Sequence, residues 1–232
     1  MRTNSEKRWA RPIQAVIFDM DGLMLDTERL DREHFGRAAA DFGYLELEPI
    51  YLETVGRNWS DTRKHFQQVL GENFPFDELR ARWRTYSKDY ANKFGVPLKT
   101  GLENLLSVLD RIGIPKAVAT STQRHDALPL LETVALLNRF TVVVTGDEVS
   151  HGKPAPDIFL TAARRLSVDP KCCVVFEDSP AGIAAAHAAG MVPILVPDVV
   201  PPTDETRRIA HRVLSSLEEA VVLFTTDELH FL

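Results

Sequence analysis

Short runs of apolar residues recur along the chain and alternate with segments whose apolar residues have helical spacing. The runs are rich in β-branched residues and lack polar alternation, which is typical of strands buried on both faces of a sheet. Five of them lie at residues 15–18, 116–119, 141–144, 173–176 and 193–196. Helical patterns lie among the later runs, at residues 102–112, 156–166 and 180–189. The alternation predicts an α/β fold, a doubly wound parallel sheet with helices on both faces.

The segment after the first predicted strand interrupts this alternation, because it contains only helical patterns. Three helices are expected there, at residues 30–42, 60–70 and 79–94. The middle one is expected to begin with Ser60 or Asp61 as its N-cap, just as Ser179 is expected to cap the helix at 180–189. We therefore predict a helical cap domain inserted into a core that comes from two parts of the chain. The expected boundaries are 27–94 for the cap, and 1–26 with 95–232 for the core.

Composition and charge narrow the class of protein. The 232 residues include 33 acidic and 27 basic ones, a net charge of −6, which argues against a general nucleic-acid partner. No apolar run reaches the ~18 to 20 residues that span a bilayer, and no apolar stretch of a signal peptide follows the basic segment 1–12. Adjacent Cys172 and Cys173 would point to opposite faces of a strand, which disfavours a disulfide and indicates a reducing compartment. We expect a cytoplasmic protein without a membrane partner, a monomer or weak homodimer, whose tail (214–232) packs on the core or on a second subunit.

Polar side chains follow the predicted strands at their carboxyl ends, the edge where ligands bind in an open parallel sheet. The candidates after the first four runs are, in turn, Asp19 and Asp21, Thr120 and Ser121, Lys153, and Glu177 and Asp178. Because the carboxyl ends of parallel strands meet at one edge, we expect these side chains to converge on one crevice.

This set of residues favours phosphoryl transfer. Four carboxylates and one lysine carry an excess of negative charge, and oxygen ligands without His or Cys favour Mg²⁺. Lys153 and the hydroxyl of Thr120 would then bind phosphoryl oxygens. A carboxylate that attacks a phosphate ester forms an aspartyl-phosphate, and Asp21, past a turn, can protonate the leaving oxygen and later activate water.

Four motifs carry a resemblance to a known family: Asp19-Met20-Asp21-Gly22-Leu23, Thr120-Ser121, Gly152-Lys153-Pro154-Ala155-Pro156-Asp157, and Glu177-Asp178-Ser179-Pro180-Ala181-Gly182. In order and spacing, from about residue 13 to 222, they resemble the motifs of the haloacid dehalogenase superfamily. The stretch from Asp19 to Glu28 is similar to the β-phosphoglucomutase-like subgroup, whose helical cap is inserted where this chain has its helical segment.

The resemblance implies roles for the candidate residues. Asp19 would be the nucleophile, Asp21 the acid and base, and Thr120 and Lys153 the phosphoryl-binding groups. Mg²⁺ would be held by the carboxylates of Asp19 and Asp178 and the backbone carbonyl of Asp21, with Glu177 next to the metal or among its ligands. A cap that closes over the substrate is also implied, with hinges near residues 26–27 and 95–96.

Several branches of the family can be weighed against the residues present. Dehalogenases need no acid two residues after the nucleophile, so Asp21 argues against them. Phosphonatases use a cap lysine as a Schiff base, for which Lys64 and Lys88 are available, although each is more simply a surface residue. In the mutases a histidine stands where this chain has Asp31, and an arginine comes three residues after a cap glycine, whereas Arg57 directly follows its glycine. Both departures favour hydrolysis over phosphosugar transfer.

We therefore predict a Mg²⁺-dependent phosphomonoesterase that acts on a small phosphorylated metabolite, a sugar phosphate first of all. The substrate would contact Thr120, Ser121, Lys153 and Arg57. A β-phosphoglucomutase-type mutase is the alternative enzyme. A binding module that has lost its chemistry would lack at least one of Asp19, Asp21, Lys153 or Asp178, and all four are present.

Overall fold

The computed structural model describes residues 11–225, which contain one six-stranded sheet of order β3-β2-β1-β4-β5-β6. All neighbouring strands are parallel, and Phe18 in the central strand is paired with Val118 on one side and Phe176 on the other. The strands are β1 (Ala15–Phe18), β2 (Lys116–Ala119), β3 (Val142–Val144), β4 (Cys173–Glu177), β5 (Val192–Leu195) and β6 (Arg212–Val213). The five predicted strands are confirmed to within one residue at each end, whereas β6, with two residues and no apolar run, has no signal in the sequence.

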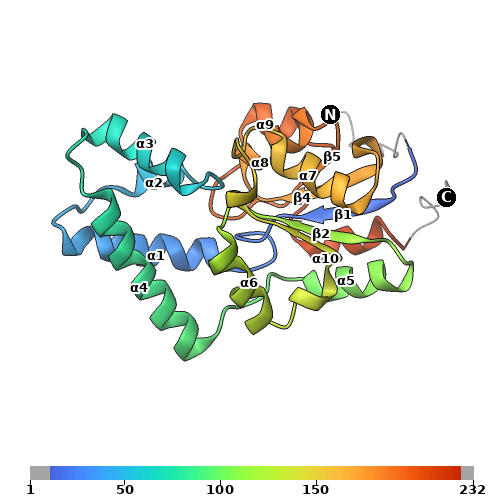
Figure 1. Ribbon diagram of the computed structural model, residues 1–232, viewed down its shortest axis with the longest axis horizontal. Helices are drawn as coiled ribbons and strands as arrows, with labels where there is room; N and C mark the ends of the chain where they lie inside the picture. The colour runs from blue at the N-terminus through green and yellow to red at the C-terminus, as the bar shows by residue number, and fades with distance from the viewer. Residues whose placement is uncertain (1–10, 226–232) are drawn as a thin grey trace.

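Helices cover both faces of the sheet, so the predicted doubly wound α/β architecture is confirmed. In Figure 1, α7 and α8 lie above the strands, and α5 and α10 lie below them. Side chains alternate along β1, so that Val16 and Phe18 pack on the second pair, and Ala15 and Ile17 on the first. The core helices are α5 (Leu102–Arg111), α6 (Arg124–Thr133), α7 (Asp157–Leu166), α8 (Pro180–Ala188), α9 (Asp204–Ile209) and α10 (Leu217–Val222), with single 3₁₀ turns at η1 (Leu137–Arg139), η2 (Gly146–Glu148) and η3 (Pro170–Cys172).

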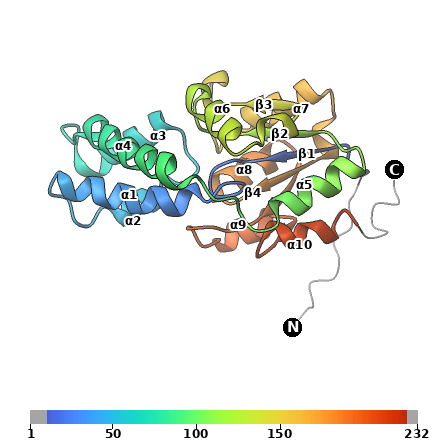
Figure 2. The same ribbon diagram turned by 90° about the horizontal axis from the view of Figure 1, so that it is seen from below.

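The C-terminal part of the chain was expected to pack on the core or on a second subunit. The portion that the structure describes packs on the core. Helix α10 lies beside α5 (Figure 2), and Leu217, Ala220 and Phe224 are buried against the sheet. Residues 226–232, like most of the basic segment 1–12, lie outside the described residues. Cys172 and Cys173 are both buried and free, as predicted. Between residues 11 and 225, no helix combines the length and the apolar character needed to cross a membrane.

Four helices occupy the segment predicted as a cap, and they lie beyond the carboxyl ends of the strands (Figure 1). They are α1 (Thr27–Asp41), α2 (Glu48–Leu52), α3 (Trp59–Leu70) and α4 (Phe76–Phe94). They enclose a separate apolar cluster, in which the ring of Phe35 contacts those of Tyr51, Phe66 and Trp83. The expected N-cap of α3 is wrong: Asn58, not Ser60 or Asp61, accepts the capping hydrogen bond, from the backbone N–H of Asp61 at 3.0 Å.

The chain enters and leaves this helical segment through two strand-like stretches that lie side by side. Leu25 is bridged to Leu98, and the backbone N–H of Asp26 donates to the carbonyl of Pro97 at 2.9 Å. The ammonium group of Lys99 also reaches Asp198 at 2.7 Å. The two crossings therefore form one paired connection, close to the segments predicted as hinges. The exact boundaries of the cap stay a prediction.

Candidate active site

Four loops at the carboxyl edge of the sheet bring the predicted residues together. Asp19 follows β1, Thr120 follows β2, Lys153 lies between β3 and α7, and Glu177 ends β4. The turn after Asp19 depends on Gly22, whose φ is +77°, a conformation that favours glycine. A Cβ on Gly22 would also lie 2.4 Å from Oδ2 of Asp178, so the first and fourth loops can meet only at a glycine.

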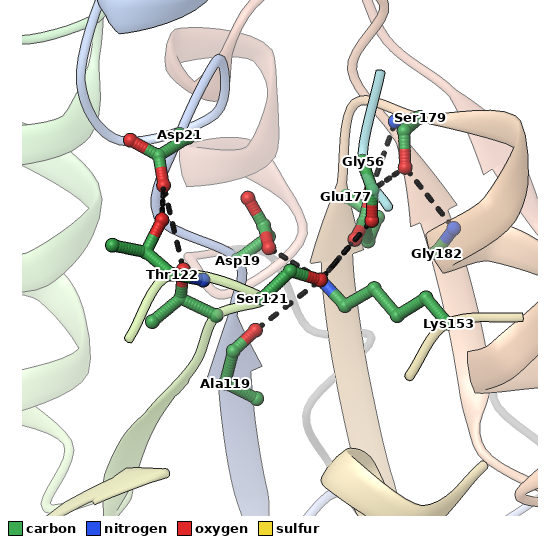
Figure 3. Close-up of polar contacts among 11 residues, drawn as sticks. Asp19, Asp21, Gly56, Ala119, Ser121, Thr122, Lys153, Glu177, Ser179 and Gly182 are labelled. Atoms are coloured by element: carbon green, nitrogen blue, oxygen red, sulfur yellow. Dashed lines mark hydrogen bonds and ion pairs between the residues drawn. The ribbon is translucent and has the colours of Figure 1, made fainter. Parts of the chain in front are cut away.

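Lys153 is the centre of the site (Figure 3). Its ammonium group donates to Oδ1 of Asp19, to Oε1 of Glu177 at 2.6 Å and to the carbonyl of Ala119 at 3.3 Å. The side chain is 1% exposed, and Glu177 is fully buried. An ammonium has three N–H donors, so all three are used in this arrangement. The predicted convergence of Asp19, Lys153 and Glu177 is therefore present in the structure.

Glu177 is held from its other side by the start of α8. Its Oε2 accepts hydrogen bonds from the backbone N–H of Ser179 at 2.8 Å and from the Ser179 hydroxyl at 2.9 Å. The Ser179 oxygen in turn accepts from the N–H of Gly182 at 3.0 Å, which makes Ser179 the predicted N-cap. A Cβ at Gly182 would lie 1.8 Å from Glu177. With both oxygens of Glu177 engaged, this carboxylate is suited to hold Lys153 in position.

Asp21 lies beside Asp19, and its carboxylate accepts hydrogen bonds from hydroxyl groups. Thr27 donates to Oδ1 at 2.9 Å, and Thr122 donates to Oδ2 at 2.7 Å, with Thr120 at 3.4 Å from the same oxygen. The sequence patterns mark Thr27 only as part of an expected hinge, and they give Thr122 no role in binding or catalysis. Thr27 lies within the stretch that resembles the β-phosphoglucomutase-like subgroup, and Thr122 directly follows the second motif. The motifs could therefore have pointed to both residues.

Asp19, Glu177 and Asp178 form the acidic cluster of the described residues, with one oxygen of each within 4.8 Å of the others. Burial raises the pKa of Asp19 to about 8. The positive charge of Lys153 acts to lower this pKa, and the negative charge of Glu177 acts to raise it further. Burial and the neighbouring carboxylates raise the pKa of Asp178 well above its usual range. Burial disfavours the charge on Lys153, but Asp19 and Glu177 outweigh this effect and raise its pKa. A cluster of oxygen donors with this much unfavourable negative charge fits a hard divalent cation.

A small, partly open inner cavity of about 90 Å³ lies between the cap and the core beside Asp19. Asp19, Asp21, Thr120 and Ser121 line it from the core, and the exposed Arg57 lines it from the cap loop. The Ser121 hydroxyl donates to the carbonyl of Gly56 at 3.1 Å, so the predicted substrate residue also joins the core to the cap. A Cβ on Gly56 would lie 2.4 Å from the Ser179 hydroxyl, which shows how closely the two parts approach.

Two carboxylates of α1 face the same cavity, and the sequence patterns indicate a binding role for neither of them. Glu28 and Asp31 are three residues apart, a spacing that places both on one face of a helix. Burial raises the pKa of Glu28 well above its usual range, with Asp31 and Asp21 adding to the effect, although a hydrogen bond from Tyr51 opposes it. Burial raises the pKa of Asp31 to about 6. In the sequence, their spacing of three residues within a helical segment was the feature that could have indicated a shared site.

Comparisons with known proteins agree with this geometry. The model of the haloacid dehalogenase-like hydrolases matches residues 16–196. The chain belongs to this family. It is 34% identical to the phosphorylated carbohydrates phosphatase of Thermotoga maritima, over 77% of this chain and 82% of that protein. It is 33% identical to the fructose-1-phosphate phosphatase YqaB of Escherichia coli, over 76% of this chain and 92% of that protein.

The fold is also similar to that of β-phosphoglucomutase from Clostridium difficile. The TM-score is 0.78 at 20% identity, over 94% of this chain and 97% of that one, a likeness that concerns the fold alone. The resemblance drawn from the four motifs is therefore confirmed, and so is the prediction of a phosphatase within this haloacid dehalogenase-like family. The mutase alternative is not favoured, because the two sequence relatives described above are phosphatases.

Proposed function

We propose that the chain hydrolyses the phosphate monoester of a small polyhydroxylated metabolite, a sugar phosphate, through a covalent intermediate on Asp19. The observation that carries the proposal is the placement of Asp19 against the buried ammonium of Lys153 at the floor of a cavity. The names of the two phosphatase relatives support the substrate class.

In the first step, an oxygen of Asp19 attacks phosphorus and the bond to the leaving oxygen breaks. Lys153 supplies a fixed positive charge that offsets the repulsion between carboxylate and phosphate. The side chains of Thr120 and Ser121 both line the inner cavity, and their hydroxyl groups, which donate to Asp21 and to the carbonyl of Gly56 in the structure, would turn to donate to phosphoryl oxygens. Arg57 lines the same cavity from the cap, which supports its contact with the substrate. The products of this step are the aspartyl-phosphate and the leaving alkoxide, which needs a proton.

Asp21 is the group that supplies this proton. Thr27 and Thr122 donate the two shorter hydrogen bonds to its oxygens, and neither residue is a proposed phosphoryl-binding group. In the second step the ionised Asp21 accepts a proton from water, and the hydroxide oxygen attacks the aspartyl-phosphate. Asp19 leaves as a carboxylate, phosphate is released, and the enzyme returns to its starting state.

The acidic cluster fits Mg²⁺, for which Asp19, Asp178 and the backbone carbonyl of Asp21 would be the ligands. When bound, the cation would offset the charge of the carboxylates and of the phosphoryl group. Both Glu177 oxygens already accept hydrogen bonds from Lys153 and Ser179, which supports a place next to the metal ligands for this residue.

The test is phosphate release from a panel of sugar phosphates and from p-nitrophenyl phosphate, with Mg²⁺ and with a chelator. We expect Mg²⁺-dependent release that falls at least ~10⁴-fold in Asp19→Asn. The matched control is Asp89→Asn, which changes an exposed carboxylate of α4 and should leave the rate unchanged. Release that is equally fast in Asp19→Asn and the wild type would rule out the proposed nucleophile.

A further inference from the structure

A second cavity continues from the inner one, between the cap helices α1 and α4 and the core helix α6. Its volume is about 600 Å³, within the range of ~300 to 1,000 Å³ that is common for small-molecule sites. Asp21 and Asp31 line both cavities, whereas Asp19 lines only the inner one. A leaving group whose oxygen is protonated by Asp21 would therefore extend past Asp31 into the outer cavity.

The Asp31 carboxylate is held so that one oxygen is used and the other is spare. Oδ1 accepts from the hydroxyl of Ser87 at 2.6 Å and from the indole N–H of Trp83 at 3.2 Å. The Ser87 hydroxyl is itself 3.1 Å from Nδ1 of His34, which completes a short chain of polar contacts. Among the described residues none donates to Oδ2, and this oxygen is not among the buried atoms without a partner. This oxygen is therefore open to the cavity, where a bound molecule can donate a hydrogen bond to it.

The charges around Asp31 restrict what that donor can be. A carboxylate only accepts hydrogen bonds when ionised, so its partner must carry an O–H or N–H. Asp21 and Glu28 line the same inner cavity. Arg57 also lines the inner cavity, and Arg84 and Lys88 line the outer one, but none of the three pairs with Asp31. A second phosphate or a carboxylate placed directly against the free oxygen of Asp31 would meet the like charge of this carboxylate. A neutral hydroxyl group meets none of this repulsion.

We propose that Asp31 is a specificity-determining residue, which accepts a hydrogen bond from a hydroxyl group of the leaving group and selects monophosphates of polyhydroxy compounds. This rests on the phosphatase activity proposed above. A substrate that lacks the hydroxyl leaves the carboxylate without its donor, and a hydrogen bond to a charged group corresponds to roughly 10- to 100-fold in kcat/KM. Ser87 and Trp83 are the positioning residues for this carboxylate.

The test compares the best sugar phosphate of the panel with its monodeoxy analogues and with p-nitrophenyl phosphate, in the wild type, Asp31→Ala and Asp31→Asn. We expect one deoxy analogue to be turned over ~10- to 100-fold less efficiently than its parent by the wild type. In both variants this ratio should fall below about 3, while activity on p-nitrophenyl phosphate stays within about 3-fold. The matched control is Glu33→Gln on the exposed face of α1, which should keep the wild-type ratio.

The isosteric Asp31→Asn variant keeps the inference falsifiable if Asp31→Ala does not fold. A ratio that persists in Asp31→Asn would overturn the role of Asp31, as would equal losses on the sugar phosphate and p-nitrophenyl phosphate. A wild-type protein that releases phosphate from none of the compounds, p-nitrophenyl phosphate included, would instead refute the proposed function and this inference with it.

Discussion

At the core end of the cavity, Lys153 is 1% exposed and all three of its N–H groups meet oxygen atoms, whereas at the cap end Arg57 and Lys88 are exposed to solvent. The side chains of the core end lie on loops that follow four neighbouring strands. At the cap end, the Asp31 carboxylate keeps a spare oxygen. The difference supports the proposed division of roles: the paired groups of the core would bind the phosphoryl group, and the spare oxygen of Asp31 would accept a hydrogen bond from the remainder of the substrate.

The two ends should differ most in how much stability and activity the protein loses when a lysine is replaced. Lys153→Met leaves Asp19 and Glu177 buried without a cation, so we expect a loss of about 3–5 kcal/mol in the free energy of unfolding and of roughly 10³-fold or more in kcat. Lys88→Met, on the exposed face of α4, should change the stability by less than about 0.5 kcal/mol. Urea denaturation and phosphate release measure both quantities. Comparable stability losses in the two variants would contradict the contrast.

Asp21 lies where the two ends meet, so its substitution should depend on the leaving group. Asp21→Asn cannot protonate a sugar alkoxide, and we expect kcat to fall by about 10² to 10⁴-fold on a sugar phosphate. The p-nitrophenolate ion leaves without a proton, so the loss on the aryl ester should be at least tenfold smaller. Steady-state rates on the two substrates decide the matter. Equal losses on both would exclude a role as general acid.

Metal binding should act on the core end and depend on pH. Because burial raises the pKa of Asp19 to about 8, the metal-free fold is expected to lose stability as the pH rises from about 4 through 8. A cation binds the ionised carboxylates, so Mg²⁺ should stabilise more at pH 8 than at pH 6. At pH 8 we expect Tm to rise by roughly 5–10 °C at a free Mg²⁺ concentration about 100 times Kd.

Thermal melts with Mg²⁺ and with EDTA at the two pH values test this prediction. Asp178→Asn removes one expected ligand and should abolish most of the shift. Asp147→Asn, which changes an exposed carboxylate beyond β3, should retain it. A shift of the same size at both pH values would contradict the proposed link between metal binding and ionisation of the cluster.

The same contrast explains what the sequence could predict. The strands of the core are continuous apolar runs, and each catalytic candidate follows one of them, so local patterns were enough to bring Asp19, Lys153 and Glu177 together. Glu177 and Gly182 belong to the same short motif, and a glycine is needed at residue 182 because a Cβ there would collide with Glu177. Strand β6 left no such pattern, since its two residues are only half-buried.

The cap end was less predictable because its contacts join residues that are far apart in the chain. Asp31 on α1 is held by Ser87, 56 residues later on α4, and a helical period alone does not reveal how two helices pack. The N-cap of α3 was misplaced for a related reason. Asn58, Ser60 and Asp61 are all good N-cap residues, and the choice among them follows from where the cap loop meets the core.

The smallest expected effect concerns the point at which the two ends touch. A Cβ on Gly152 would lie 2.1 Å from Nδ2 of Asn58, whose side chain caps α3, so Gly152→Ala should displace the closed cap. We expect kcat/KM to fall about tenfold, since small misplacements of this kind are costly, with a change in stability below about 1 kcal/mol. Gly36→Ala, where the new methyl group meets no atom within 4 Å, should keep full activity and slightly stabilise α1. Unchanged turnover in Gly152→Ala would mean that Asn58 yields without moving the cap, and that the core end can work without tight seating of the cap.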